Sequence, residues 1–226
     1  MPVNLENYKE ISSFLKEKNA TLVAVSKTKT VEEILELYHL GQRDFGENYV
    51  QELAEKYEQL PKDIRWHFIG HLQSNKVKYI APFVDLIQSV DSEKLLKEIN
   101  KQAAKNNRVI DCLLQVHIAD EETKFGFDEK EMNNFFETNF KHDSENYKNI
   151  RIQGLMGMAS FTDNNEKIKS EFKKLKKLFD TYFSNPTPHI SHILSCGMSA
   201  DYKIAIEEGS NMVRIGSLLF GKRLAS

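Results

Sequence analysis

The sequence has little cysteine, with Cys112 and Cys196 the two examples among 226 residues. Their spacing matches no metal-binding motif, and two cysteines cannot build the disulfide framework of a small secreted domain, so the chain is typical of a reducing compartment. No apolar run approaches the ~20 residues that a membrane-spanning helix needs. Residues 1–19 are polar and charged and contain no apolar core of a signal peptide. We therefore expect a cytoplasmic protein without a membrane partner.

An excess of charge of one sign is also lacking, because 31 lysines and arginines face 33 aspartates and glutamates, for a formal net charge of −2. Nucleic-acid-binding domains usually carry a basic surplus. The basic run at 173–177 falls on the polar face of an expected helix, close to Glu166 and Glu171, which is typical of a solvated charged face. The composition therefore predicts an ordinary soluble globular protein without a nucleic-acid partner.

Short apolar runs alternate with amphipathic segments along the chain. The apolar runs predict strands at 21–27, 44–48, 65–69, 86–90, 109–118, 150–158, 192–195 and 212–215. Helical periodicity predicts helices at 4–18, 30–41, 50–60, 92–103, 166–183 and 200–208. Residues 119–147 are expected to hold a loop and a helix.

Eight strands alternating with helices predict an α/β protein of the (β/α)8 TIM-barrel type, with an extra helix at its N-terminus. The sequence shows no linker, repeat or low-complexity segment, so we expect a single domain over residues 1–226. A doubly wound open sheet is the alternative, but it needs no eighth strand and usually carries a glycine-rich fingerprint after its first strand. No such fingerprint follows Lys27.

Lys27 stands at the end of the first expected strand and is a candidate for covalent chemistry. Desolvation lowers the pKa of a lysine at the end of a buried strand, which leaves its amine able to attack a carbonyl. The alternative interpretation is that Lys27 is simply the first solvated residue after a core strand.

Two loops rich in serine and glycine, 195–199 and 216–217, follow the last two expected strands. Barrels often bind phosphate between these loops, although such residues can also simply make tight turns. Arg214 lies inside an apolar strand and keeps its charge, so it needs a structural carboxylate or a ligand as acceptor. A reactive amine, a phosphate site and a cation for a ring nitrogen together describe a pyridoxal 5'-phosphate site.

Several motifs, in this order, carry a resemblance to a known family: VSKTK at 25–29, FGENYVQE at 45–52, WHFIGHLQSNK at 66–76, LQVHIADEETKFGF at 114–127, GLMGMAS at 154–160, LSCGMSADYKIAIEEGS at 194–210 and VRIGSLLFG at 213–221. Through these motifs the chain closely resembles the pyridoxal phosphate homeostasis protein family over nearly its whole length. The resemblance implies a barrel like the N-terminal domain of alanine racemase, with pyridoxal 5'-phosphate held as a Schiff base on Lys27.

The resemblance also implies roles for other residues. Ser199, Gly216 and Ser217 are expected to hold the phosphate, Arg214 to face the pyridine nitrogen, Asn48 to line the edge of the cofactor, and Met156 or Met158 to pack on its ring. Lys124 belongs to one of the matched motifs, and its chemistry alone suggests no role.

A member of this family is expected to carry or buffer the cofactor and to support vitamin B6 and amino-acid homeostasis, without turning over a defined substrate. The expected partners are the cofactor and apo-enzymes that receive it, and we expect a monomer. The alternatives are a pyridoxal-phosphate-dependent amino-acid racemase and a phosphate-binding barrel that forms no covalent bond with its ligand.

Racemisation needs an acid or base group on each face of the substrate. In the racemase that this barrel resembles, a tyrosine of a second domain supplies one of them. Because the chain ends at Ser226, soon after the last expected strand, we expect that domain to be absent. Tyr49 or Tyr202 could in principle replace its tyrosine.

Overall fold

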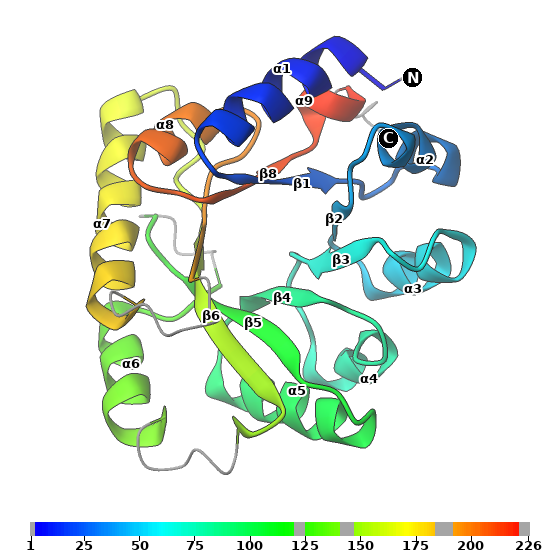
Figure 1. The fold of residues 1–226 in the computed structure, drawn as a ribbon. Helices are drawn as coiled ribbons and strands as arrows, with labels where there is room; N and C mark the ends of the chain where they lie inside the picture. Colours follow the sequence, from blue (N-terminus) through cyan, green and yellow to red (C-terminus); the bar gives the residue numbers. More distant parts are fainter. Residues whose placement is uncertain (1–2, 120–124, 141–146, 184–191, 222–226) are drawn as a thin grey trace.

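Strand β1 (Thr21–Val25) lies between β8 and β2 in the computed structural model and pairs with both in parallel. From β1 onward each strand pairs with the next in the sequence, so eight strands close into a barrel (Figure 1). The structure describes residues 3–119, 125–140, 147–183 and 192–221. It confirms the predicted (β/α)8 barrel.

The other strands are β2 (Asp44–Glu47), β3 (Arg65–Phe68), β4 (Leu86–Val90), β5 (Ile110–Val116), β6 (Ile150–Gly157), β7 (Ile193–Ser195) and β8 (Met212–Ile215). The helical segments are α1 (Leu5–Glu17), α2 (Val31–His39), α3 (Val50–Gln59), η1 (Ser74–Lys76), α4 (Val77–Ile80), α5 (Glu93–Lys105), α6 (Glu129–Asn134), η2 (Phe135–Phe140), α7 (Asn165–Phe183), α8 (Tyr202–Glu207) and α9 (Ser217–Phe220). The expected strands and helices agree with these bounds to within a few residues. The short helix α9 was not expected from the sequence.

Local sequence explains where some of these helices begin. The hydroxyl of Thr30 accepts a hydrogen bond from the backbone of Glu33, and the carboxylate of Glu33 accepts one from the backbone of Thr30. Asp128 and Glu131 make the same reciprocal pair at the start of α6. Such a capping box satisfies two backbone donors that the helix leaves unpaired. The loops that lead into α2 and α6 therefore end at defined residues.

The strands of the barrel bury both of their faces. In β1, Leu22 and Ala24 belong to the large cluster between strands and helices, and Val23 belongs to a second cluster inside the barrel, as the two-residue period of a strand requires. The inner cluster comprises Val23, Leu86, Leu113, Met156 and Met212. Trp66, the single tryptophan, is fully buried in the outer cluster with its ring centroid 6.0 Å from that of Phe45.

The N-terminal helix α1 lies over β1 and β8, beside α9 (Figure 1). The backbone N–H of Asn4 donates to the carbonyl of Leu219 at 2.8 Å, and the side-chain amide of Asn7 donates to that of Leu218 at 2.9 Å. The predicted extra helix is therefore attached to the last helix of the barrel, which closes the seam between the first and last strands.

The pairing of β5 with β6 is irregular, because its register shifts between Cys112 and Leu113. Gly154, opposite Leu113, has a φ of +157°, and a Cβ atom at this position would overlap the carbonyl oxygen of Ile193 in β7. Only glycine permits this close approach of backbone to backbone.

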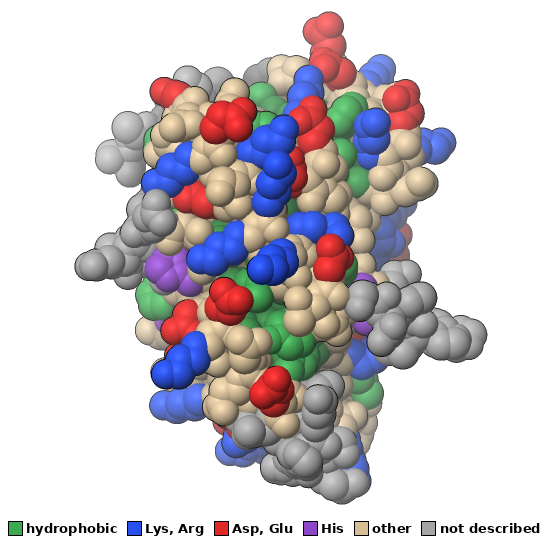
Figure 2. All heavy atoms as spheres, turned by 90° about the vertical axis from the view of Figure 1, so that its left-hand side faces the viewer, with side chains coloured by type: hydrophobic (Ala, Val, Ile, Leu, Met, Phe, Trp, Pro, Cys, Tyr) green, Lys and Arg blue, Asp and Glu red, His purple; other side chains and the backbone are tan. Residues whose placement is uncertain are grey.

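The surface over α7 carries charges of both signs. Lys176 pairs with Asp180, and Lys169 lies 3.7 Å from Glu208. On this face, lysine and arginine side chains alternate with acidic ones and form no continuous basic patch (Figure 2). This mixture agrees with the solvated charged face predicted for 173–177. In the part of the chain that the structure describes, no helix combines the length and apolar character needed to span a membrane.

Candidate functional site

The carboxyl ends of the strands bring most of the predicted site residues to one end of the barrel. Lys27 follows β1, Asn48 follows β2, Met158 follows β6, Ser199 follows β7, and Gly216 and Ser217 follow β8. In barrels of this type, the loops at this end build the ligand site. We call this end the C-terminal mouth.

The loop that carries Lys27 is fixed on both sides of the lysine. The backbone N–H of Ser26 donates to the carbonyl of Gly46 at 3.0 Å, and that of Thr28 donates to the carboxylate of Glu52. Thr28 has a φ of +65°, which is uncommon for a residue with a side chain. Lys27 itself is half-buried. The backbone that carries its amine is thus held in one defined conformation.

Lys29, the next lysine along, has its ammonium group engaged elsewhere. Its Nζ donates to the carbonyl of Phe220 at 2.9 Å and to the carboxylate of Glu33 at 3.3 Å. These contacts attach the loop to α9 and engage the ammonium group of Lys29 in the structure.

A buried ion pair lies beneath the same loop. The ammonium of Lys56 donates to Glu47 Oε1 at 2.8 Å, to the carbonyl of Ser26 at 2.7 Å and to Glu52 Oε1 at 2.6 Å. The hydroxyl of Ser26 donates to the same oxygen of Glu47 at 2.6 Å. Burial raises the pKa of the Glu47 carboxyl, while the charge and hydrogen bond of Lys56 act in the opposite direction. This cluster positions the residue that precedes Lys27, and sequence reasoning missed it.

Asn48 contributes a buried amide oxygen, Oδ1, that has no hydrogen-bond partner among the described residues. Buried polar atoms in folded proteins are nearly always hydrogen-bonded, so an orphaned acceptor is a place for a donor on a ligand. Gly70 lies directly against the backbone of Asn48, because a Cβ atom there would overlap its carbonyl oxygen.

Arg214 is buried inside the barrel, and its hydrogen bonds go to neutral oxygens. Its Nη1 donates to the carbonyl of Ser195 at 2.9 Å and to the hydroxyl of the same residue, and its Nη2 donates to the carbonyl of Gly157 at 2.9 Å. Burial lowers the pKa of this guanidinium. No carboxylate of the described residues forms an ion pair with it. The structural carboxylate considered as its partner is therefore not observed among the described residues.

The serine- and glycine-rich loops after β7 and β8 meet at the mouth. The backbone N–H of Gly216 donates to the hydroxyl of Ser199 at 3.3 Å. A Cβ atom on Gly216 would lie 3.2 Å from the carbonyl oxygen of Val25, so the glycine also lets the last loop approach β1 closely. Small residues with hydroxyl and N–H groups thus meet in the loops after β7 and β8.

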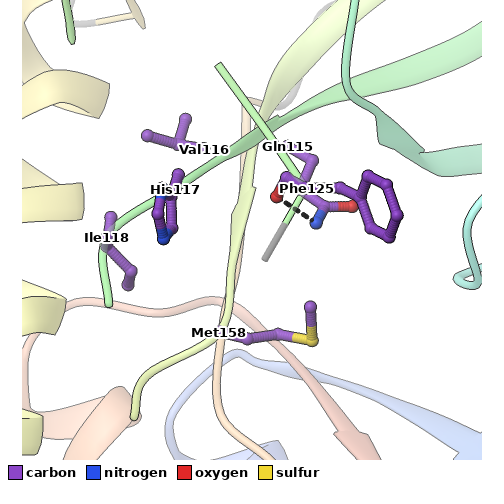
Figure 3. Close-up of a pocket in the computed structure, with 6 residues that line it drawn as sticks. All are labelled: Gln115, Val116, His117, Ile118, Phe125 and Met158. Carbon is purple, nitrogen blue, oxygen red and sulfur yellow. Dashed lines mark hydrogen bonds between the residues drawn. The ribbon is translucent and has the colours of Figure 1, made fainter. Parts of the chain in front are cut away.

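The two methionines considered for the ring face lie at different depths. Met156 is fully buried in the inner cluster of the barrel. Met158 lines a small cavity at the mouth together with Gln115, Val116, His117, Ile118 and Phe125 (Figure 3). In Figure 3 the amide of Gln115 donates to the backbone carbonyl of Phe125, at 2.7 Å. Met158 is therefore better placed than Met156 to contact a ligand at the mouth.

The two histidines with HxxxH spacing occupy separate places. His71 is exposed at the mouth, where it stacks on Phe125 with ring centroids 4.1 Å apart and lies 3.0 Å from a carboxylate oxygen of Asp91. His67 is buried inside the barrel. Lys124, singled out in the sequence, lies outside the described residues.

Sequence reasoning also missed a row of polar side chains inside the barrel. Gln88 and Ser195 are completely buried, and His67 is 3% exposed. Each is a polar residue at an inward position of its strand. Of the three, His67 alone stands between two large apolar residues, Trp66 and Phe68, and this alternation was the available signal. It did not reveal which of these residues meet across the barrel.

The sequence is similar to known proteins over nearly its whole length. The chain matches the family model described as alanine racemase, N-terminal domain, over residues 5–223. It is 43% identical over 208 residues to the pyridoxal phosphate homeostasis protein of Aquifex aeolicus, an alignment that covers 92% of this chain and 89% of that protein. It is 39% identical over 222 residues to the protein of the same name from Haemophilus influenzae, covering 95% and 92%.

Solved structures show the same relationship. PipY of Synechococcus elongatus without PLP superposes with a TM-score of 0.84 at 31% identity, covering 96% of this chain and 99% of that one. The structure of PipY with PLP bound superposes with a TM-score of 0.81 at 29% identity, covering 95% and 100%. Alanine racemase from Bartonella henselae, at 16% identity and a TM-score of 0.67, shares the fold, and the similarity covers 62% of its length.

Proposed function

Because the chain belongs to the pyridoxal phosphate homeostasis protein family, we propose that it binds pyridoxal 5'-phosphate at the C-terminal mouth of the barrel. The cofactor supplies an aldehyde that combines with an amine, a phosphate and a pyridine ring. The PipY structure described with PLP bound supports this choice of ligand. Lys27 is the amine that we assign to the aldehyde.

One observation carries the proposal: the loops after β7 and β8 meet, with Gly216 N–H 3.3 Å from the hydroxyl of Ser199, at the same end of the barrel as Lys27. A phosphate between these loops would accept hydrogen bonds from Ser199, Ser217 and the backbone of Gly216. Charge-assisted hydrogen bonds of this kind are among the stronger ones in proteins.

The other mouth residues fit the remaining parts of the cofactor. Arg214 brings a buried cation whose hydrogen bonds to the described residues end on neutral oxygens, which suits an electron-rich ring nitrogen. Asn48 offers an unpartnered acceptor for a hydroxyl of the ligand. Met158, rather than the deeper Met156, is the methionine that we assign to the ring face.

The protein then carries or buffers the cofactor in support of vitamin B6 and amino-acid homeostasis. We propose that it acts as a monomer in the cytoplasm and releases the cofactor to apo-enzymes that need it. The residues that we assign to the aldehyde, the phosphate and the ring support this role, because together they account for each part of the cofactor.

Borohydride reduction followed by peptide mapping tests the assignment of Lys27. Reduction makes the bond between the cofactor and its amine permanent, so we expect the modified peptide to carry Lys27. The variant Lys27→Ala should bind the cofactor without the absorption band of a covalent adduct, and the control Lys76→Ala should keep that band.

Modification of Lys29 or Lys76 in the wild-type protein would show that Lys27 is not the attachment residue. Tight binding without any reducible adduct would instead favour the alternative of a phosphate-binding barrel that forms no covalent bond. A wild-type protein that binds no pyridoxal 5'-phosphate would overturn the proposed function itself.

A further inference from the structure

A continuous row of hydrogen bonds crosses the inside of the barrel from Arg214 to Asp44. Arg214 Nη1 donates to the hydroxyl of Ser195, which donates to Gln88 Oε1 at 2.7 Å. Gln88 Nε2 lies 2.9 Å from His67 Nδ1, and His67 Nε2 lies 3.0 Å from Asp44 Oδ1. We call these five residues the interior polar chain. It joins strands β8, β7, β4, β3 and β2.

All the hydrogen bonds of the interior polar chain run in one direction. The Ser195 hydroxyl accepts from Arg214, so its single proton goes to Gln88 Oε1. The amide nitrogen of Gln88 must then face His67 and donate to Nδ1, which places the imidazole proton on Nε2, toward Asp44. The direction in which Arg214 donates thus fixes the hydrogen-bond orientation of Ser195, and through Ser195 that of Gln88 and His67. The same hydrogen bonds hold the guanidinium in place.

The interior polar chain ends at the opposite mouth of the barrel. Asp44 is also held by Arg65, and both line a cavity of about 330 Å³ at the N-terminal ends of the strands. The first carboxylate that Arg214 reaches along the chain is therefore Asp44. Gln88 and Ser195 are completely buried, so water does not substitute for a lost link.

The interior polar chain determines the orientation in which Arg214 can bind a ligand. A guanidinium has five N–H donors in a rigid plane, and the two oxygens of Ser195 and the carbonyl of Gly157 receive three of them. The described residues provide no acceptor for the other two donors, whose direction follows from the plane that Ser195 and Gly157 fix. A change in Ser195 or its partner Gln88 therefore alters the angle at which the remaining donors are presented.

We propose that Gln88 and Ser195 are positioning residues for Arg214, holding its guanidinium in the orientation that recognises the ring nitrogen of pyridoxal 5'-phosphate. The inference rests on the proposed function, since it takes the cofactor as the ligand. It goes beyond that function by assigning selectivity for a ring nitrogen to two residues that act through Arg214.

The test measures the preference of the protein for a ring nitrogen. The dissociation constants of pyridoxal 5'-phosphate and of its 1-deaza analogue, in which carbon replaces the ring nitrogen, are compared in each variant by titration. The wild-type protein should prefer the cofactor. Gln88→Leu and Ser195→Ala should each reduce this preference about tenfold, which corresponds to about 1.4 kcal/mol. The visible absorption band of the bound cofactor should shift in both variants, because the electronic environment of its ring has changed.

Two controls separate positioning from general damage to the fold. Gln102, another buried glutamine, donates to Glu98 on α5 and takes no part in the chain, so Gln102→Leu should leave the preference unchanged. Ser195→Ala removes a single oxygen atom and keeps the inference testable if Gln88→Leu does not fold. In Arg214→Leu, the further change Gln88→Leu should have no additional effect on the preference.

The outcomes distinguish this inference from the proposed function. If Gln88→Leu and Ser195→Ala weaken both ligands equally, or if the wild-type protein shows no preference for the ring nitrogen, the positioning role is wrong while cofactor binding stands. If the wild-type protein binds neither ligand, the proposed function fails first and the inference fails with it.

Discussion

Ser199 and Ser217 are the hydroxyl side chains that we expect to hydrogen-bond the phosphate. The double variant Ser199→Ala with Ser217→Ala should weaken pyridoxal 5'-phosphate binding by at least about tenfold, because a hydrogen bond to a charged acceptor contributes about 1.5–3 kcal/mol. Pyridoxal, which lacks the phosphate, is the matched control and should bind with nearly unchanged affinity. Titration by absorbance measures both constants, and equal weakening of the two ligands would place the phosphate elsewhere.

Asp44 should make stability depend on pH in the acid range. Burial raises the pKa of its carboxyl, but the hydrogen bonds of His67 and Arg65 and the charge of Arg65 outweigh burial and lower that pKa from 3.8 to about 2. A carboxyl with a lowered pKa stabilises the folded state above its unfolded pKa, and this contribution is lost as the pH falls toward the folded pKa. The shift corresponds to about 2 kcal/mol.

Urea unfolding of the wild-type protein and Asp44→Asn checks this prediction. The wild-type protein should be more stable than Asp44→Asn at pH 6, and this difference in the free energy of unfolding should be about 2 kcal/mol smaller at pH 2. Most of the decrease should occur between pH 4 and pH 2. Asp180→Asn, at an exposed pair with Lys176 on α7, is the control and should show little pH-dependent difference. A difference for Asp44→Asn that is constant from pH 6 to pH 2 would contradict the lowered pKa.

The sequence singled out individual residues where a charged side chain interrupts or ends an apolar strand. Lys27 and Arg214 are charges at or within apolar strands, and the structure places Arg214 inside the barrel as its strand position required. The partners of Arg214 were not predictable, because Ser195 and Gln88 are 107 residues apart and meet only when the barrel closes. The cluster of Glu47 and Lys56 was missed because a lysine in the last turn of a helix, as Lys56 is in α3, is usually solvated.

Gly154 tests how the elements of the barrel fit together. In Gly154→Ala, the new Cβ atom would meet the carbonyl of Ile193 and the backbone would keep a φ of +157°. Steric overlap and backbone strain together should lower the free energy of unfolding by about 4 kcal/mol. Gly41 is the matched control, because it has a φ of +98° and a Cβ atom added there would meet no atom within 4 Å. Gly41→Ala should therefore cost about 1 kcal/mol from backbone strain alone.

Denaturant unfolding of these two glycine variants separates overlap from strain. Equal losses for Gly154→Ala and Gly41→Ala would mean that β6 and β7 move apart easily at this position. In that case the close approach at the irregular pairing of β5 and β6 would have no specific role in closing the barrel.

At the scale of elements, the sequence predicted long and strongly patterned segments well. The helix at 166–183 agrees with α7 because apolar residues recur along it at helical spacing. Segment α9 was not expected, since its four residues, SLLF, are too short to show a period. The shift in register between β5 and β6 was also beyond prediction, because it arises from contact between strands and not from the pattern within either.

For the whole molecule, we predict that amino-acid racemisation is not efficient. Two positioned acid or base groups are needed, one on each face of the substrate. Of the two tyrosines considered as the second group, Tyr202 is buried, with its ring edge-on to Phe14 of α1 at 5.9 Å between centroids. Its ring is therefore engaged between α8 and α1. Exchange of the Cα proton of L-alanine for deuterium should be slower than about 1 s⁻¹, below the usual range for enzymes.

The second tyrosine provides the control for this assay. Tyr49 is 55% exposed at the start of α3, after the end of β2. If the Cα proton exchanges at a rate in the usual enzyme range and this exchange disappears in Tyr49→Phe, the protein is a racemase and the proposed carrier function is wrong. Formation of D-alanine is measured in the same samples to show that exchange reports racemisation.

The closed barrel was predictable from the number and alternation of the strands, because eight parallel strands joined by helices are typical of it. The pairing that closes the barrel, between Thr21 of β1 and Met212 of β8, joins residues at opposite ends of the chain. No local pattern marks such a pair. The interior polar chain depends on this closure, which is why the sequence alone did not reveal it.

The burial of a single tryptophan in the wall of the barrel makes the protein its own optical probe. Trp66 directly precedes His67 in β3, so its indole lies on the outer side of the strand that carries the interior polar chain on its inner side. All tryptophan emission comes from this one position. A bound ligand that absorbs near-ultraviolet light would take up part of this emission by energy transfer. Loading and release at the mouth could then be followed in real time, without a label, by the lifetime of one fluorophore.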